Sequence, residues 1–195
     1  MYLFGASGHG KVVAEIAKIN QIEITAVIDE DVNKRTLLGH EVIHEVPETP
    51  QAEVIISVGN NQSRKNIVER FPGFRYPVLR HPASQLSVSA VTGEGTVVMA
   101  GALVNSEAKI GKHCIINSNA VVEHECEIGD FVHVSPSASL AGNVIVGEGS
   151  QIGIGASVIQ GIKIGKWCTI GAGAVVIRDV PDGATVVGNP AKIIQ

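Results

Sequence analysis

The sequence has few aromatic side chains, few cysteines and no long apolar run. It holds one Trp, two Tyr and four Phe in 195 residues, although 45% of its residues are hydrophobic. No apolar stretch approaches the roughly 20 residues that cross a bilayer, and no basic segment precedes an apolar one at the start, as a secretory signal would require. Three cysteines without a CxxC pair argue against a disulfide framework or a zinc knuckle. A net charge of −4 disfavours a nucleic-acid partner. We expect a cytoplasmic protein without a membrane span.

Glycine, in contrast, is abundant and unevenly distributed. Residues 1–80 contain six of the 22 glycines, and residues 81–195 contain the other 16. The aromatic residues show the opposite bias, since five of them lie in the first segment. Two prolines, Pro77 and Pro82, stand at the transition and favour an extended connection there. The composition therefore predicts two domains, 1–80 and 81–195, the second with a C-terminal tail.

The first domain alternates strand and helix signals. Apolar runs predict strands over residues 1–5, 23–29 and 53–59. Apolar residues at helical spacing predict one helix over 11–20, after the glycine-rich turn, and apolar residues between charges predict a surface helix over 61–71. This order indicates a small Rossmann-like α/β domain with a parallel sheet. The segment around His40, His44 and Glu45–Glu48 is expected to be a solvated loop, and Arg80-His81-Pro82 a linker.

The second domain repeats every six residues. From Val98 to Val176, 14 successive positions at this spacing are aliphatic, and glycine often follows them. The position four residues after each aliphatic is mostly small, and it includes Cys114, Cys126 and Cys168. This is the hexapeptide signature of a parallel β-helix, in which three short strands and their corners form one triangular coil. A narrow interior of this kind excludes aromatic rings, and it gives the cysteines the role of space-filling, inert thiols.

The turn from Gly5 to Gly10 is a candidate nucleotide site, because glycines let the backbone approach a phosphate at a helix N-terminus. Gly5-x4-Gly10-Lys11 approximates a Walker A loop, but Val12 replaces the magnesium-binding Ser or Thr. The Rossmann pattern G-x-G-x-x-G is not met either. Asp29 ends the second strand, where an acid can bind a ribose hydroxyl. A tight turn without ligand, or a site for NAD or ATP, are the alternatives.

His124 lies between Glu123 and Glu125 in the β-helix and suits a general base, since a paired carboxylate holds the tautomer of an imidazole. The spacing leaves open which glutamate makes this pair. A zinc site of His113, His124 and His133 is disfavoured, because steps of 11 and nine residues in an 18-residue coil place them on different faces. No metal is expected.

Four segments then match one family in order: GASGHGK, the strand end Gly59-Asn60-Asn61, VVEHECEIGDFVHVSPSASLAGNV and VVGNPAKII. The chain resembles the PglD/NeuD group of bacterial sugar-nucleotide acetyltransferases, which belong to the left-handed β-helix superfamily. The resemblance implies left-handed coils, a homotrimer and active sites between adjacent β-helices.

The resemblance also implies roles for individual residues. His124 matches the general base and Glu125 the acid that enhances its basicity. The acetyl-CoA contacts of the family fall on His133, Gly142, Ile154 and Ala172, and its sugar-nucleotide contacts fall on Ser7, Gly8, His9, Asp29, Glu30 and Gly59. Ala172 and Glu30 depart from the family pattern, where a glycine and a second Asp can occur.

The expected function is acetyl-CoA-dependent N-acetylation of a UDP-4-amino-4,6-dideoxy sugar in bacterial glycan biosynthesis, by direct transfer. O-acetylation of a sugar hydroxyl of the sialic-acid type and a dTDP- or GDP-linked acceptor are the nearest alternatives. A nucleotide-dependent oxidoreductase or sensor and a non-catalytic β-helix scaffold are the more distant ones.

Overall fold

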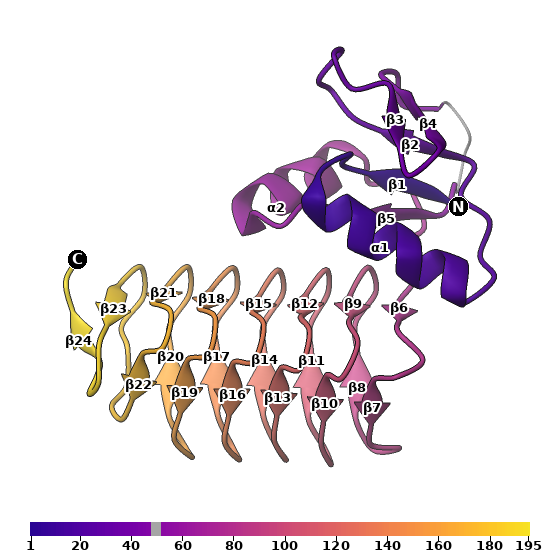
Figure 1. Cartoon of the computed structure of the whole chain (residues 1–195). Helices are drawn as coiled ribbons and strands as arrows, with labels where there is room; N and C mark the ends of the chain where they lie inside the picture. The colour runs from indigo at the N-terminus through magenta and orange to yellow at the C-terminus, as the bar shows by residue number, and fades with distance from the viewer. Residues whose placement is uncertain (48–51) are drawn as a thin grey trace.

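The computed structural model describes residues 1–47 and 52–195, which form an α/β domain and a long β-helix beneath it (Figure 1). Of the loop expected around His44, Glu48 lies outside the described residues. No helix among the described residues is long and apolar enough to span a membrane.

The α/β domain contains a five-stranded sheet with the order β3-β4-β2-β1-β5. Its strands are β1 (Tyr2–Phe4), β2 (Ala26–Ile28), β3 (Thr36–Leu37), β4 (His40–Ile43) and β5 (Val54–Ile56). All neighbours pair in parallel except β3 and β4, which are antiparallel. Strands β2 and β5 are buried along their whole length, as expected for a parallel sheet covered on both faces. The predicted Rossmann-like domain is confirmed.

Two helices cover opposite faces of this sheet. Helix α1 (Gly8–Ile19) packs Val13 and Ile16 against Leu3, whereas α2 (Asn61–Arg70) packs Ile67 against Phe4, the next residue of the same strand. Successive residues of a strand point to opposite faces, so the two helices lie on different sides. The first helix begins three residues earlier than the sequence predicts, because the glycine-rich segment supplies its first turn.

The prediction of a solvated loop around His40 is wrong. His40 lies on β4, which pairs with β2 and forms a hairpin with β3. The hairpin is held by Leu37 and Val42, which are 3% and 5% exposed. The two strands are very short and contain only these two deeply buried side chains. The alternation of apolar and polar residues that identifies a strand in a sequence therefore cannot be recognised here.

The β-helix has three faces, each a stack of short strands, and we name each face after one of its strands. Neighbouring strands pair in parallel, except that β24 is antiparallel to β23 at the C-terminal end. The β9 face contains β6 (Leu79–Arg80), β9 (Val97–Val98), β12 (Ile115–Ile116), β15 (His133–Val134), β18 (Gln151–Ile152), β21 (Thr169–Ile170), β23 (Thr185–Val187) and β24 (Lys192–Ile193). The β10 face contains β7 (Gln85–Leu86), β10 (Leu103–Val104), β13 (Val121–Val122), β16 (Ser139–Leu140), β19 (Ser157–Val158) and β22 (Val175–Val176). The β11 face contains β8 (Val91–Thr92), β11 (Lys109–Ile110), β14 (Glu127–Ile128), β17 (Ile145–Val146) and β20 (Lys163–Ile164). Arg80 belongs to β6, which pairs with β9, so its assignment to a linker is wrong.

The predicted interior of the β-helix is confirmed. The 14 aliphatic residues from Val98 to Val176 are at most 4% exposed, and the three cysteines beside them are buried and unpaired. Coils stack so closely that a Cβ on Gly111 would lie 2.7 Å from the carbonyl carbon of Gly129. This contact explains the glycines that follow the aliphatic positions.

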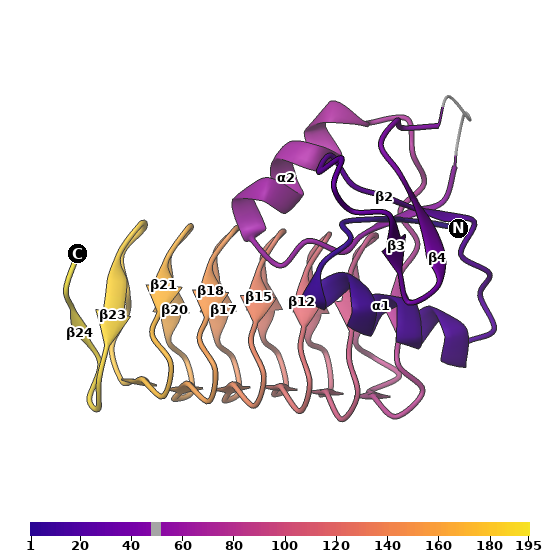
Figure 2. The ribbon, with the colours of Figure 1, turned by 45° about the horizontal axis from the view of Figure 1, so that its top comes forward.

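The α/β domain sits on the first coils of the β9 face (Figures 1 and 2). The outward side chains of Val97 and Ile115 on this face belong to the same apolar cluster as Val13 of α1. Further along the face, Gln151 and Thr169 are exposed, because the α/β domain ends before them. The change from apolar to polar outward residues therefore marks how far the domain extends.

Candidate functional site

His124 and Glu125 lie on the edge where the β10 face turns into the β11 face, which we call the β10/β11 edge. His124 Nδ1 is 3.1 Å from Glu125 Oε2, and both side chains are more than half exposed. Glu125 has a positive φ of 59°, the left-handed conformation that recurs at every corner from Gly95 to Gly173. This turn brings the glutamate side chain to the imidazole of the residue before it.

The contacts of Glu123 and Glu125 differ in the structure, although their spacing from His124 left open which of them forms the pair. Glu123 Oε2 accepts a hydrogen bond of 2.8 Å from Asn105 Nδ2, one coil earlier. Its carboxylate is therefore bound to the preceding coil, and Glu125 is the acid that contacts His124.

Gly142 lies one coil after His124 on the same edge. A Cβ at this position would be 2.5 Å from Cε1 and Nε2 of His124, so only glycine leaves room for the imidazole there. The N–H of Gly142 forms no hydrogen bond with the described part of the chain. A free backbone donor thus stands directly beside the ring, where it can bind a developing negative charge.

The glycine-rich turn forms an open helix N-terminus. Gly5 has a φ of +118°, and a Cβ on Gly10 would collide with the Gly5 carbonyl, so both glycines are required by the turn itself. Ser7 is the N-cap of α1, but its side chain does not cap the helix. Around Gly8, nothing lies within 4 Å of an added Cβ. The N–H groups of residues 8–10 have no hydrogen-bond partner among the described residues, as is typical of an anion site.

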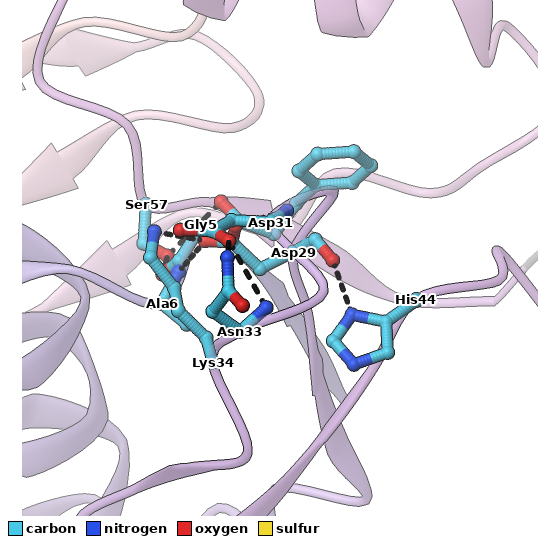
Figure 3. Close-up of polar contacts among 9 residues, drawn as sticks. Gly5, Ala6, Asp29, Asp31, Asn33, Lys34, His44 and Ser57 are labelled. Atoms are coloured by element: carbon cyan, nitrogen blue, oxygen red, sulfur yellow. Dashed lines mark hydrogen bonds and ion pairs between the residues drawn. The ribbon is translucent and has the colours of Figure 1, made fainter.

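Asp29 closes this turn from the end of β2 (Figure 3). Its Oδ2 accepts hydrogen bonds from Ala6 N at 2.6 Å and Lys34 Nζ at 2.8 Å, and its Oδ1 accepts one from Asp31 N at 3.0 Å. Burial alone would raise the pKa of Asp29, but these donors outweigh it and lower the pKa below 3.8. A carboxylate has about four acceptor positions, so one on Oδ1 is left for a hydroxyl.

Sequence reasoning missed His44 and Lys34 as partners of Asp29. His44 follows β4 and places Nδ1 2.9 Å from the Asp29 carbonyl oxygen, while its Nε2 is buried without a partner (Figure 3). The short apolar pair Val42-Ile43 before His44 was the only signal that a strand ends there. Glu30 is exposed and pairs with Arg70 at 2.7 Å.

A third group of residues lies where the α/β domain meets the β9 face. Asn117 Nδ2 is 2.9 Å from His133 Nε2, and because an amide nitrogen only donates, the neutral His133 carries its proton on Nδ1. His133 Nδ1 and His9 Nε2 are buried without hydrogen-bond partners. Burial, together with the charge of Arg64, lowers the pKa of both histidines to about 4. Two neutral imidazoles therefore face the junction with unused polar atoms.

Within one chain, the predicted site residues form separate groups. Glycines 8 and 59 and His9 belong to the α/β domain over the β9 face, whereas His124 lies on the opposite edge of the triangular prism. A third group, Ile154 and Ala172, lies on the edge between the β9 and β10 faces, where the Ile154 side chain is 61% exposed. The structure therefore does not bring the predicted base to the predicted nucleotide site of the same chain.

The three histidines considered for zinc are equally dispersed. His113 lies at the edge between the β11 and β9 faces, stacked at 5.2 Å on Phe131, while His124 and His133 occupy the other positions described above. Among the described residues, no group of three or more His, Cys, Asp or Glu side chains could hold a metal ion.

Comparison with known proteins agrees with both domains. Residues 1–71 match the PglD N-terminal domain, and residues 89–124, 108–142 and 143–178 match the bacterial transferase hexapeptide family. Among curated proteins, the UDP-N-acetylbacillosamine N-acetyltransferase of Bacillus subtilis strain 168 is 44% identical over 108 residues. That alignment spans 50% of this chain and 50% of the relative.

Solved structures match over the whole chain. PerB of Caulobacter crescentus, solved in complex with CoA and GDP-perosamine, is 37% identical with a TM-score of 0.94, and the match covers 100% of this chain and 96% of PerB. The acetyltransferase domain of PglB from Neisseria gonorrhoeae, solved with acetyl coenzyme A, is 41% identical with a TM-score of 0.90, covering 99% and 98%. The chain therefore belongs to the PglD-type sugar-nucleotide acetyltransferases, which carry a left-handed β-helix.

Proposed function

We propose that this protein transfers the acetyl group of acetyl-CoA to the amino group of a nucleotide-linked 4-amino-4,6-dideoxy sugar, with His124 as the general base. The observation that carries this proposal is the His124–Glu125 pair at 3.1 Å beside the free N–H of Gly142. A base, its orienting acid and an oxyanion donor are the three parts that acyl transfer to an amine needs.

The reaction is a direct displacement. The sugar nitrogen attacks the thioester carbonyl carbon while His124 removes a proton from that nitrogen. Collapse of the tetrahedral intermediate breaks the C–S bond and releases CoA, whose sulfur can take a proton back from His124. Glu125 stabilises the imidazolium that forms in between, and the N–H of Gly142 stabilises the negative oxygen.

A covalent acetyl-enzyme is not part of this mechanism. All three thiols are buried in the β-helix, and burial raises the pKa of Cys114 to about 12. A thiol with so little thiolate is a poor nucleophile.

We place the nucleotide sugar at the turn formed by Ser7, Gly8 and His9. The open N-terminus of α1 suits the diphosphate, and the remaining acceptor of Asp29 suits a ribose hydroxyl. Glu30 and Gly59 lie next to the same edge of the sheet. Uridine is the proposed nucleoside, because the curated Bacillus subtilis relative is named for a UDP-linked sugar. The GDP-perosamine complex of PerB makes guanosine the first alternative.

Acetyl-CoA is proposed to contact His133, Gly142, Ile154 and Ala172. These residues lie on different edges and faces of one β-helix, so a single chain offers only parts of a binding site. A homotrimer with each site between two β-helices brings the β10/β11 edge of one chain to the nucleotide domain of another. We therefore propose this assembly as the active form.

The test is an acetyl-transfer assay with UDP-, dTDP- and GDP-linked 4-amino-4,6-dideoxyhexoses and the corresponding 4-hydroxy sugars. We expect the UDP-linked amine to react fastest. His124→Ala should reduce kcat by about 10²–10⁴-fold, the usual contribution of a general base, while acetyl-CoA binding persists.

Two results would overturn the proposal. Near-normal turnover by His124→Ala would show that His124 is not the general base. Preferential acetylation of the 4-hydroxy sugar would show that the protein is an O-acetyltransferase. The variant His81→Ala, outside the proposed site, controls for the loss of a histidine as such.

A further inference from the structure

Among the described residues, Arg64 is the largest fully buried side chain, at 1% exposure. No carboxylate of the described residues pairs with it. A buried charge without an opposite charge needs dense hydrogen bonding to be tolerated. Burial also lowers the pKa of Arg64, to about 10, which leaves it charged at neutral pH.

All five N–H groups of Arg64 have an acceptor. Nε donates to the His113 carbonyl at 2.7 Å, and Nη2 donates to the Phe131 carbonyl and Asn61 Oδ1, both at 2.8 Å. Nη1 donates to the carbonyls of Val58 at 3.0 Å and Gly59 at 3.2 Å. The guanidinium therefore joins two separate parts of the protein through their main chains.

On one side, these acceptors are corners of the β-helix. His113 and Phe131 occupy equivalent corner positions of successive coils, at the edge between the β11 and β9 faces. Asn61 Nδ2 continues the row by donating to the Gly149 carbonyl at 3.0 Å. Lys65 pairs with Glu148 at 2.6 Å. The first residues of helix α2 thus contact three successive coils at this edge.

On the other side, the acceptors belong to the loop between β5 and α2. This loop leaves the same edge of the sheet as the glycine-rich turn and Asp29, and a Cβ on Gly59 would meet nothing within 4 Å. The loop is therefore open at Gly59, on the sheet edge where we place the nucleotide sugar, while Arg64 holds the carbonyls of Val58 and Gly59.

We propose that Arg64 is a positioning residue for the acceptor: it fixes the 58–59 loop to the corners of the β-helix and thereby sets where the nucleotide sugar stands relative to the acetyl group. This inference rests on the proposed function for its catalytic consequence, but the attachment of the loop is a property of the fold. Arg64 contacts no substrate in this account and acts through the main chain of Gly59.

The test is Arg64→Lys, which keeps the charge but has three donors in place of the planar five. Lys65→Met is the matched control, because it removes a contact of the same helix to the same edge without touching the 58–59 loop. KM for acetyl-CoA, KM for the UDP-linked 4-amino-4,6-dideoxyhexose and kcat are measured for both variants. Amide hydrogen exchange of residues 57–61 is measured on the same proteins.

For Arg64→Lys we expect the acceptor KM to rise about tenfold, the acetyl-CoA KM to stay within about twofold, and exchange in residues 57–61 to accelerate while the coils keep their protection. Lys65→Met should leave both KM values unchanged. A lower kcat with both KM values unchanged, or unchanged exchange in the loop, would show that Arg64 only stabilises the fold.

Two provisions separate the possible failures. If Arg64→Lys does not fold, Asn61→Ala replaces it and should raise the acceptor KM about threefold, since it removes one of the five acceptors; no change would overturn the proposal. If the wild-type protein acetylates none of the amino-sugar nucleotides, the proposed function fails, and hydrogen exchange alone decides whether Arg64 holds the loop.

Discussion

At the scale of single residues, the conformation of Glu125 separates it from the other acids of the edge. Glu107 occupies the same corner position one coil earlier, with the same φ of 59°, but a serine precedes it where His124 precedes Glu125. The pair is therefore a local product of the hexapeptide corner: the left-handed residue turns its side chain toward its predecessor. The spacing of residues predicts the pair but not which glutamate forms it, because the hydrogen bond from Asn105 to Glu123 depends on the neighbouring coil; only the family resemblance pointed to Glu125.

Glu125→Gln should lower kcat about tenfold, because a charge-assisted hydrogen bond contributes about 1.5 kcal/mol or more. Steady-state kinetics at saturating acetyl-CoA measure the effect. Glu107→Gln is the control and should leave kcat unchanged. Equal losses in both variants would mean that the charge of the edge, and not the contact with His124, supports turnover.

At the scale of elements, periodicity decided what the sequence could show. The 14 regularly spaced aliphatic positions predict the β-helix from the sequence alone, and the apolar runs of β1, β2 and β5 are long enough to be recognised as strands. The β3–β4 hairpin was missed because two short strands around Leu38-Gly39 give no repeated pattern. With β4 missed, His44 and its contact with Asp29 could not be anticipated.

The interior of the β-helix predicts unreactive thiols. Cys114, Cys126 and Cys168 are buried, and burial raises the pKa of Cys114 to about 12 and that of Cys126 above its usual value. Ellman's reagent at pH 8 should therefore find no fast-reacting thiol in the native protein and three after denaturation. A thiol that reacts within seconds in the native state would contradict the assignment of the cysteines to the interior.

The buried histidines predict a loss of stability in acid. Burial lowers the pKa values of His9, His113 and His133 to about 4 in the folded protein, against 6.5 ordinarily. Unfolding then takes up protons between these values, so the free energy of unfolding is fully maintained above pH 6.5 and falls as the pH drops toward 4. Urea unfolding at pH 7 and pH 5 measures this difference.

His113→Phe should remove part of that dependence, because the His113 ring stacks on Phe131 and meets Tyr76 edge to face, contacts that a Phe ring can also make. We expect the change in unfolding free energy between pH 7 and pH 5 to shrink by up to about 2 kcal/mol. An unaltered pH dependence would show that His113 does not titrate differently in the folded and unfolded states.

At the scale of the whole molecule, the central feature is the separation of functions within one chain. The α/β domain covers the first coils of the β9 face (Figure 1). His124 lies between β13 and β14, on the β10/β11 edge opposite that face. Sequence reasoning from the family resemblance expected a site between chains, whereas composition and spacing could not, because they give the order of residues along a coil and not the arrangement of coils in an assembly.

The most direct measurement is complementation between two inactive variants. His124→Ala removes the proposed base. Gly8→Asp places a negative charge at the open N-terminus of α1, where it should repel the diphosphate without a clash, since nothing lies within 4 Å of its Cβ. Each variant alone should be inactive, and each should fold. If sites form between chains of a trimer, unfolding and refolding an equal mixture should restore about a quarter of wild-type activity, the fraction of sites that receive both intact halves. Activity no greater than that of the separate variants would contradict the account, because it would mean that His124 and the nucleotide turn of the same chain serve one site.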